Sequence, residues 1–411
     1  MTETAAPSAM DRFALDAQEQ QQMEELYKEL HAHPELSMQE HRTAERLEEL
    51  LEELGVEHFR CGGTGVVGIL RNGDGPTIAF RADTDGLPIA EDTGLPYASQ
   101  ARGTLPDGTD VPVMHGCGHD THVTSLITAA RLLVRERDAW SGTVVLIFQP
   151  GEETSAGAQA MVDDGLWDRA PRPEAVLGQH VWPDRAGTVQ LTLGPAMAAA
   201  DSLRVTVFGE QSHGSQPQSG VDPIVLGASV VMRLQGIVAR EISPLKSAVV
   251  TVGTFHAGLK ENIIPDRAEF TVNIRSLEDD VREQVLAAVE RIVRAEAEAS
   301  GAPEPTIEKM YDFPVNHNDE DAAHRVLDAL QGTLGEANAT LGPPRMGSED
   351  FGRLATAIDV LPSVFWFFGG FDRAGDDLPV NHSPFFGPVI EPTLTTGTRA
   401  ALTGILEWVG R

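Results

Sequence analysis

The sequence predicts an α/β protein of two domains, in which a smaller α+β domain is inserted into a larger one. Three observations predict this class. Short apolar segments typical of strands alternate with helical segments in the first half of the chain, the pattern changes near Ser202, and the first pattern resumes toward the C-terminus. A length of 411 residues also exceeds what one hydrophobic core usually serves. We expect residues 1–198 and 312–411 to form the larger domain and residues 199–311 the inserted one.

The larger domain opens with two predicted helices and continues with strands. Leu, Met and Ala recur at helical spacing over residues 18–31 and 38–54, and the proline of His33-Pro34-Glu35-Leu36 separates the two segments. The predicted alternation that follows is strand, helix, strand and strand, at Thr77–Ala82, Ser125–Val134, Thr143–Phe148 and a segment that opens at Ala175–Leu177. This order predicts a mainly parallel mixed sheet flanked by helices.

The inserted domain has a different order of elements. The pattern predicts strand, helix, strand, strand, helix and strand, at Leu203–Phe208, Pro223–Ala239, Ala248–Phe255, Ala268–Arg275, Asp279–Ala299 and Thr306–Met310. This βαββαβ order is typical of a ferredoxin-like sandwich. A strand at Ser363–Phe368 and the last helix return the chain to the larger domain, with a loop rich in Gly, Asp and Pro over Gly369–Pro388 between them.

The charge of the chain limits the partners that it can bind, and its cysteine content indicates the cellular compartment. The formal net charge of −31 argues against nucleic acid or an anionic membrane as partner, because both would be repelled. No segment approaches the ~20 apolar residues of a membrane span, and Met1 to Gln22 lacks the pattern of a secretory signal. Cys61 and Cys117 are the only cysteines, which favours a reducing compartment. We therefore expect a cytoplasmic protein that acts on a small molecule.

One short segment concentrates residues that bind metals. Residues 114–122 read Met-His-Gly-Cys-Gly-His-Asp-Thr-His, with three histidines, an aspartate and one of the two cysteines in nine positions. Thiolate and imidazole suit zinc and its first-row neighbours. The flanking glycines allow the backbone to fold closely around an ion. The pattern therefore predicts a metal-binding loop.

Other residues of the same kind follow the predicted strands. In open parallel sheets, ligands bind beyond the carboxyl ends of the strands. Five separate segments bring candidate ligands to that edge, namely the metal-binding loop, Asp83 and Asp85, Glu152 and Glu153, His180, and His382. Adjacent side chains of an extended segment point in opposite directions, so Glu152 can hold a water while Glu153 binds a metal. The chain thus predicts a shared metal site with a carboxylate base.

These motifs resemble a known family. From His33-Pro34-Glu35 through Arg81–Asp85, His115–His122, Gln149–Glu153 and Gly347–Phe351 to Asn381-His382-Ser383-Pro384, the chain is similar to the aminoacylase and carboxypeptidase family of co-catalytic metallopeptidases. It looks most like the amidohydrolase branch of hippurate hydrolase and the auxin-conjugate amidohydrolases. The resemblance covers almost the whole chain and implies two divalent metal ions, zinc first, with manganese, cobalt or nickel as alternatives.

The resemblance implies a role for each matching residue. Cys117 would bridge the two metals, with the remaining ligands supplied by His119, Glu153, His180 and His382. Glu152 would be the general base and then the acid that protonates the leaving amine. Related branches carry His-x-Asp where this chain reads Arg81-Ala82-Asp83, so His119 would replace the lost histidine. Asp83 would then accept a hydrogen bond that fixes the tautomer of a ligand.

The inserted domain would contribute three more residues. His213 in Ser212-His213-Gly214 matches a histidine that steadies the oxyanion in this family, and Asn262 and Arg275 match groups that hold the carboxylate of the substrate. A guanidinium suits a carboxylate because it donates two parallel hydrogen bonds. Many relatives have a second histidine soon after the first, where this chain reads Gln216-Pro217-Gln218. That departure leaves the side-chain preference open.

The remaining histidines have less specific interpretations. We expect His115 and His122 to lie beside the ligands rather than bind metal, and His31, His33 and His41 to be structural or solvated.

The sequence thus predicts a metal-dependent amidohydrolase that cleaves N-acyl or N-aroyl amino acids into a carboxylic acid and a free amino acid, by attack of a hydroxide shared between the two metals. A homodimer or higher homo-oligomer is expected, because the inserted domain offers a sheet edge for pairing. Three alternatives stay open. They are a dipeptidase or carboxypeptidase on peptide-like conjugates, a hydrolase with Cys117 as nucleophile, and a binding protein without activity.

Overall fold

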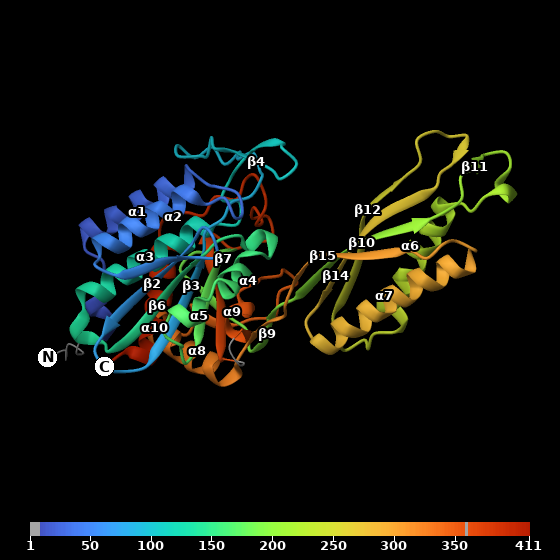
Figure 1. Ribbon diagram of the computed structural model, residues 1–411. Coiled ribbons are helices and arrows are strands. Elements are labelled where there is room, and N and C mark those ends of the chain that lie inside the picture. The colour runs from blue at the N-terminus through green and yellow to red at the C-terminus, as the bar shows by residue number, and fades with distance from the viewer. Residues whose placement is uncertain (1–8, 358–360) are drawn as a thin grey trace. The chain divides into compact units, whose positions relative to one another are not determined.

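The computed structural model describes residues 9–357 and 361–411. The chain divides into two compact units (Figure 1). Of the described residues, those within Met1–Ala196, His317–Pro343 and Asp350–Arg411 form the larger unit, and Met197–Asn316 with Pro344–Glu349 form the inserted unit. The expected α/β class, with a mixed sheet flanked by helices and an inserted α+β domain, is confirmed.

The larger unit is built on one eight-stranded sheet, in the order β1-β2-β6-β3-β7-β18-β8-β17. Its central strands β6, β3, β7 and β18 run parallel to one another, and β2 and β8 pair antiparallel beside them. The strands span Glu57–Cys61 (β1), Gly65–Asn72 (β2), Thr77–Asp83 (β3), Gly142–Gln149 (β6), Val176–Arg185 (β7), Val189–Leu191 (β8), Ala339–Leu341 (β17) and Ser363–Phe371 (β18). The parallel strands therefore end at a common edge.

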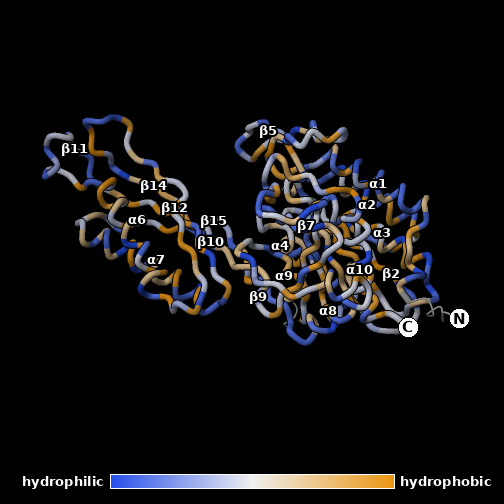
Figure 2. The backbone as a smooth tube through the Cα atoms, turned by 180° about the vertical axis from the view of Figure 1, so that it is seen from behind, coloured by the Kyte–Doolittle hydropathy of each residue, from blue (hydrophilic) through white to orange (hydrophobic). Residues whose placement is uncertain are grey.

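Helices cover this sheet and share its core. α3 and α10 pack beside each other and against β3, and the same apolar core includes residues of α1, α2 and α8. The apolar stretches of the larger unit gather in its interior (Figure 2). The helices span Ala17–His31 (α1), His41–Glu53 (α2), His119–Arg135 (α3), Gly157–Asp163 (α4), Leu166–Arg169 (α5), Glu320–Leu334 (α8), Gly352–Thr356 (α9) and Thr393–Val409 (α10). A short hairpin, Arg102–Thr104 (β4) with Asp110–Pro112 (β5), lies at the surface.

The structure departs from the sequence-based expectation at several elements. α3 begins at His119, six residues before the predicted start at Ser125, so part of the expected metal-binding loop is the first turn of a helix. β1 and β2 were not predicted, because β1 carries charged residues and β2 is interrupted by Gly68. Both strands pair antiparallel, which makes the sheet mixed.

The inserted unit is a four-stranded antiparallel sheet in the order β12-β14-β10-β15, with two helices against it. The elements span Ala199–Phe208 (β10), Pro223–Arg240 (α6), Ala248–Ala257 (β12), Arg267–Ser276 (β14), Asp279–Ala299 (α7) and Thr306–Phe313 (β15). A small second sheet pairs Ser212–His213 (β11) with Ile263–Ile264 (β13). The order of strands along the chain and across the sheet is that of the ferredoxin-like fold.

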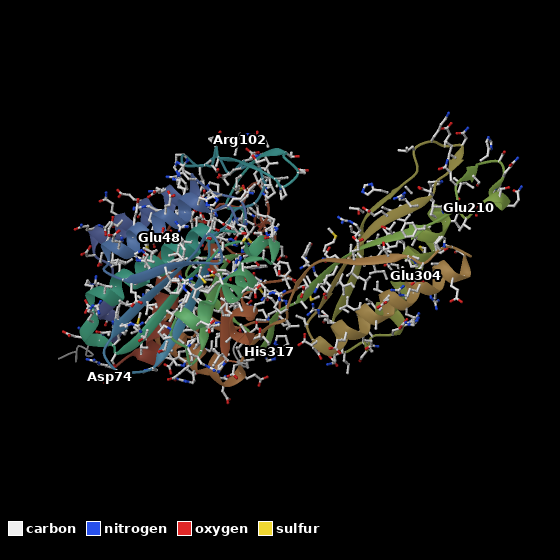
Figure 3. All side chains as sticks on the ribbon, in the orientation of Figure 1. Glu48, Asp74, Arg102, Glu210, Glu304 and His317 are labelled. Atoms are coloured by element: carbon white, nitrogen blue, oxygen red, sulfur yellow. The ribbon has the colours of Figure 1, made fainter. Side chains whose placement is uncertain are left out.

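α6 is the one helix of the described residues that has the length and apolar composition of a membrane span. Leu226, Val230, Leu234 and Ile237 of this helix are buried in the core of the inserted unit. Packing against the sheet therefore accounts for these four apolar residues of the helix. Charged side chains such as Asp74, Arg102, Glu210 and Glu304 are exposed on the two units (Figure 3).

Candidate metal centre

The candidate site lies in the larger unit, where the parallel strands end. β6 ends at Gln149 and is followed by a turn of 3-10 helix, Glu152–Thr154, that carries the paired glutamates. His180 lies within β7, and His382 lies in the loop after β18. Cys117 and His119 flank Gly118, whose φ of 80° starts α3. Each segment therefore delivers its side chain to one edge of the sheet, as the strand-end rule predicts.

The structure brings the five candidate ligands together. The ligand atoms of Cys117, His119 and His180 lie within 4.8 Å of one another, and so do those of Cys117, Glu153 and His382. The shared residue of these two groups is Cys117. The Cys117 Sγ to His180 Nε2 distance is 3.4 Å, and the His382 Nε2 to Glu153 Oε1 distance is 3.3 Å. Two ions that share a thiolate would fit two such overlapping groups.

The hydrogen bonding of these residues fits metal ions as well. His119 Nε2 and Glu153 Oε1 are buried and make no hydrogen bond within residues 9–357 and 361–411, although Asp83 Oδ2 lies 3.5 Å from the first atom and His382 Nε2 3.3 Å from the second. A buried polar atom without a partner is costly, and a coordinated ion would satisfy both atoms. The donor set of one thiol, three imidazoles and a carboxylate suits zinc and related ions. The residues present therefore fit a pair of divalent metals.

Hydrogen bonds behind the site orient the imidazoles. His119 Nδ1 lies 3.1 Å from Asp85 Oδ1, and His180 Nδ1 lies 2.6 Å from the carbonyl oxygen of Val181. When these Nδ1 atoms donate, the Nε2 atoms are left free to bind a metal. Asp85 is thus the residue that orients the His119 ring. The sequence assigns no specific role to Asp85.

Asp83 is placed differently from the expectation. Its carboxylate accepts from His122 Nδ1 at 2.5 Å and from Arg81 Nη1 at 2.7 Å, and it lies 3.5 Å from His119 Nε2. The Val181 amide donates to His122 Nε2 at 2.7 Å, so both ring nitrogens of His122 are already engaged. His122 therefore lies beside the ligands and has no free nitrogen for a metal.

Arg81 occupies the position where related branches carry a histidine. Its guanidinium donates to Asp83, to Gln149 Oε1 at 2.9 Å and to Asp350 Oδ1 at 3.3 Å, and every one of these side chains is buried. Burial, opposed by the Arg81 charge, raises the pKa of Asp350 to about 6. For Asp83 the charge of Arg81 and the nearby histidines outweigh burial and hold the pKa well below its usual range. The positive charge of Arg81 thus offsets the negative charge of the buried carboxylates behind the candidate ligands.

Burial also sets the protonation of two candidate ligands in the absence of metal. Burial, and then the neighbouring charges of Glu153 and Glu152, raise the pKa of the Cys117 thiol well above its usual value. Burial, reinforced by His122, lowers the pKa of His180 well below its usual value. His180 is therefore neutral, as metal binding requires, whereas Cys117 needs a nearby cation to become a thiolate.

The inserted unit holds the other three candidate residues. His213 is exposed and lies in β11, and the amide of Gly214 donates to the carbonyl oxygen of Asn262 at 2.8 Å, so these two candidates are neighbours. Arg275 lies near the other end of β14, where Nη1 donates to the Met346 carbonyl oxygen at 2.7 Å. At a rise of about 3.3 Å per residue, the length of β14 from Arg267 to Arg275 is ~26 Å. The structure therefore does not bring Arg275 to His213 and Asn262.

A mixed α/β sheet with thiol, imidazole and paired carboxyl groups at its strand ends fits the class of metal-dependent hydrolases with two metal ions. The comparisons identify the family within that class. Residues 79–405 match the model of peptidase family M20/M25/M40, and the chain belongs to this family.

Known relatives are similar in sequence over most of their length, and a solved structure has the same fold. The hippurate hydrolase of Campylobacter jejuni is 37% identical over 337 residues, 81% of this chain and 85% of that protein. The thermostable carboxypeptidase 1 of Saccharolobus solfataricus is 35% identical over 373 residues, 88% of this chain and 89% of that protein. The structure of the YXEP protein of Bacillus subtilis, described as a dinuclear metal binding peptidase, aligns with a TM-score of 0.75 and 30% identity over 95% of this chain and 99% of that one. This chain is accordingly an amide-bond hydrolase with the dinuclear metal-binding fold of its family.

Proposed function

We propose that this protein hydrolyses the amide bond of N-acyl or N-aroyl amino acids and releases a carboxylic acid and a free amino acid. The observation that carries the proposal is the pair Glu152 and Glu153, which lie with His119 in one group of ligand atoms within 4.8 Å of one another. One carboxylate there can bind metal while its neighbour handles protons. The hippurate hydrolase relative favours an N-aroyl amino acid among the possible substrates.

Each side chain has a defined part in this reaction. When bound, the two metals polarise the amide carbonyl and lower the pKa of a water. Glu152, which is buried, accepts the proton of that water and later delivers it to the leaving amine. His213 supports the oxyanion that forms, an interaction worth roughly 3–4 kcal/mol where single donors have been removed. Asn262 and Arg275 hold the carboxylate of the substrate.

Replacement of the proposed base tests this mechanism. Glu152→Gln keeps the size of the side chain and removes its ability to accept a proton, so kcat should fall by about 10²–10⁴-fold. Elemental analysis should still find the wild-type metal content, because the Cys117, His119, His180, Glu153 and His382 ligands are intact. Unchanged turnover of an N-benzoyl amino acid by this variant would exclude Glu152 as the base.

The metal and the substrate class are tested together. We propose zinc as the physiological metal, because thiolate and imidazole predominate among the ligands. Elemental analysis of purified protein, beside a panel of N-acyl amino acids and free dipeptides, would identify both. The carboxypeptidase relative is the reason to keep the dipeptidase or carboxypeptidase alternative, which predicts faster turnover of the peptides.

The Cys117 nucleophile alternative makes opposite predictions. It requires a reactive thiolate, whereas the pKa of this thiol is raised and its side chain is buried. Under the metal mechanism a chelator removes activity and added zinc restores it. Under the thiol mechanism iodoacetamide removes activity and a chelator has no effect.

Both cysteines are unpaired, which accords with the reducing cytoplasm that we propose as the location.

We further propose that the protein is a homodimer in which the inserted unit of one copy contributes residues to the substrate site of the other copy. An N-acyl amino acid is much shorter than the ~26 Å of β14 that separates the His213 end from Arg275. One substrate therefore cannot contact both ends of one inserted unit, and a second copy is needed to supply one of them. β12 is an edge strand, and exposed apolar side chains lie on it and on α6, namely Val249, Phe255, Val225 and Met232. An unpaired edge beside apolar side chains is suited to pairing between two copies.

A further inference from the structure

We propose that the segment Ser37–Glu40, through the carboxylate of Glu40, is a positioning device that holds the Gly151–Glu153 turn in its reactive geometry. The inference rests on the proposed roles of Glu152 and Glu153. It gives a purpose to the residues that follow His33-Pro34-Glu35, to which the reaction itself assigns none.

Glu40 is fully buried and makes three hydrogen bonds. Its Oε1 accepts from the backbone amide of Gly151 at 2.9 Å and from that of Met38 at 2.9 Å, and its Oε2 accepts from the Thr64 hydroxyl at 2.5 Å. Gly151 directly precedes the two glutamates. One side chain therefore links the loop between α1 and α2, the residue that precedes β2 and the turn after β6.

The same loop reaches the turn at a second point. The Ser37 hydroxyl donates to Asp85 Oδ2 at 2.6 Å, and this same oxygen accepts from the backbone amide of Glu153 at 3.0 Å. Two buried carboxylates thus hold two amides of the turn, one on each side of Glu152. Both amides would lack these acceptors if the turn moved away from the loop, and unpaired buried amides are costly.

Steric contact between the loop and the turn is equally close. Gly151 has a φ of 57° and Met38 a φ of 63°, a left-handed conformation that a residue other than glycine adopts only when its surroundings hold it. A Cβ on Gly151 would lie 2.5 Å from Met38 Sδ, so the methionine side chain packs directly on the glycine. The turn and the loop therefore pack directly on each other.

The charge of Glu40 is less important to this role than its shape. Burial, and then the nearby Asp85 charge, raise the pKa of Glu40 to about 7. A carboxamide of the same size keeps one oxygen for the Gly151 and Met38 amides and presents an NH₂ group to the Thr64 oxygen. Glu40→Gln should therefore preserve the contacts that Glu40→Ala removes.

The experiment compares these two variants for turnover and for exposure of the turn. We expect Glu40→Ala to lower kcat by about 10–100-fold with KM within threefold of wild type, and Glu40→Gln to recover most of the loss. Hydrogen exchange followed by mass spectrometry on the metal-free protein should show faster exchange in the peptide that covers residues 149–157 of Glu40→Ala only. The exchange readout needs neither metal nor substrate, so it stays informative even if the proposed reaction is wrong.

Glu35→Ala is the matched control. Glu35 lies in the same loop, but its carboxylate accepts from the amides of Arg42 and Thr43 at the start of α2. This variant should lose stability without a change in kcat per folded molecule or in exchange at residues 149–157. If Glu40→Ala does not fold, Glu40→Asp takes its place, because the shorter side chain withdraws the carboxylate from the Gly151 amide. Wild-type kcat and wild-type exchange of the turn in Glu40→Ala, or in Glu40→Asp as its substitute, would overturn the proposal.

Discussion

His31 occupies a buried polar site that joins three parts of the larger unit. Its Nδ1 lies 2.6 Å from Asp120 Oδ2 and its Nε2 lies 3.0 Å from Glu91 Oε1, and all three side chains are almost completely inaccessible to solvent. Burial alone would lower the pKa of His31, but Asp120 and Glu91 together raise it to about 10. The imidazolium therefore ties the end of α1 to the first turn of α3, next to the candidate ligand His119.

Replacing His31 should make this contribution measurable. His31→Gln leaves two buried carboxylates without their cation, a change that typically costs about 3–5 kcal/mol of unfolding free energy. Because the folded pKa is raised, the stabilisation is complete below pH 6.5 and disappears as the pH rises to about 10. Urea unfolding of metal-free protein across this range should show a decline for wild type that the variant lacks. The exposed neighbour His33, replaced by Gln, is the control, and an equal decline in His31→Gln would contradict the assignment.

The sequence predicts the location of a site residue well where its position along a strand determines that location. Glu153, His180 and His382 could be expected at one site because each follows or lies on one of the parallel strands of a single sheet, and the structure does bring them together. The bond from Asp85 to His119 and the partners of His31 depend on side-chain rotamers and on which helix faces meet. A single sequence carries no signal for either.

α3 shows how one element sets the geometry of the metal centre. Its first residue is the candidate ligand His119, and Gly118 before it has a φ of 80°. A Cβ on Gly118 would lie 2.4 Å from Val181 Cγ1 and 3.2 Å from Phe386 Cε1. Both neighbours are buried, so a larger residue at this position forces a shift either of these side chains or of the backbone that carries Cys117 and His119.

Gly118→Ala should therefore impair metal binding as well as stability. The left-handed conformation alone costs an alanine roughly 1–2 kcal/mol, and the contact with Val181 adds to it. Gly94→Ala separates the two effects, because Gly94 has a φ of 72° and nothing within 4 Å of its would-be Cβ. Elemental analysis and thermal unfolding should show metal loss in Gly118→Ala only. Full metal content in Gly118→Ala, with no more destabilisation than Gly94→Ala, would contradict this role of the glycine.

The elements differ in how far the sequence reveals them. α7 spans Asp279–Ala299, the bounds that its apolar spacing predicts, because two acidic residues begin it and a regular apolar face continues to its end. α3 was predicted too short because its first turn holds polar residues that serve the site rather than the core. β1 and β2 gave weak signals, since an edge strand and a strand with internal glycine lack the usual composition.

At the scale of the whole molecule, the length of the inserted unit decides which of its residues can reach one substrate. The ferredoxin-like fold places His213 and Asn262 at one end of β14 and Arg275 at the other. This separation follows from the length of a single strand within one compact unit. If all three residues act on one small substrate, two copies of the chain must contribute residues to the same site. The protein must then be an oligomer.

Mixed dimers test this arrangement directly. A His213→Ala chain and a Glu152→Gln chain are each expected to be inactive as homodimers. If His213 acts on the partner copy, a mixed dimer of the two, isolated with two affinity tags, contains one complete site and should show about half the wild-type turnover. If His213 acts within its own chain, the same dimer should be inactive. The reciprocal dimer, in which one chain carries both substitutions and the other is wild type, should be inactive in the first case and half active in the second. Sedimentation of the wild-type protein as a monomer would exclude the shared arrangement altogether.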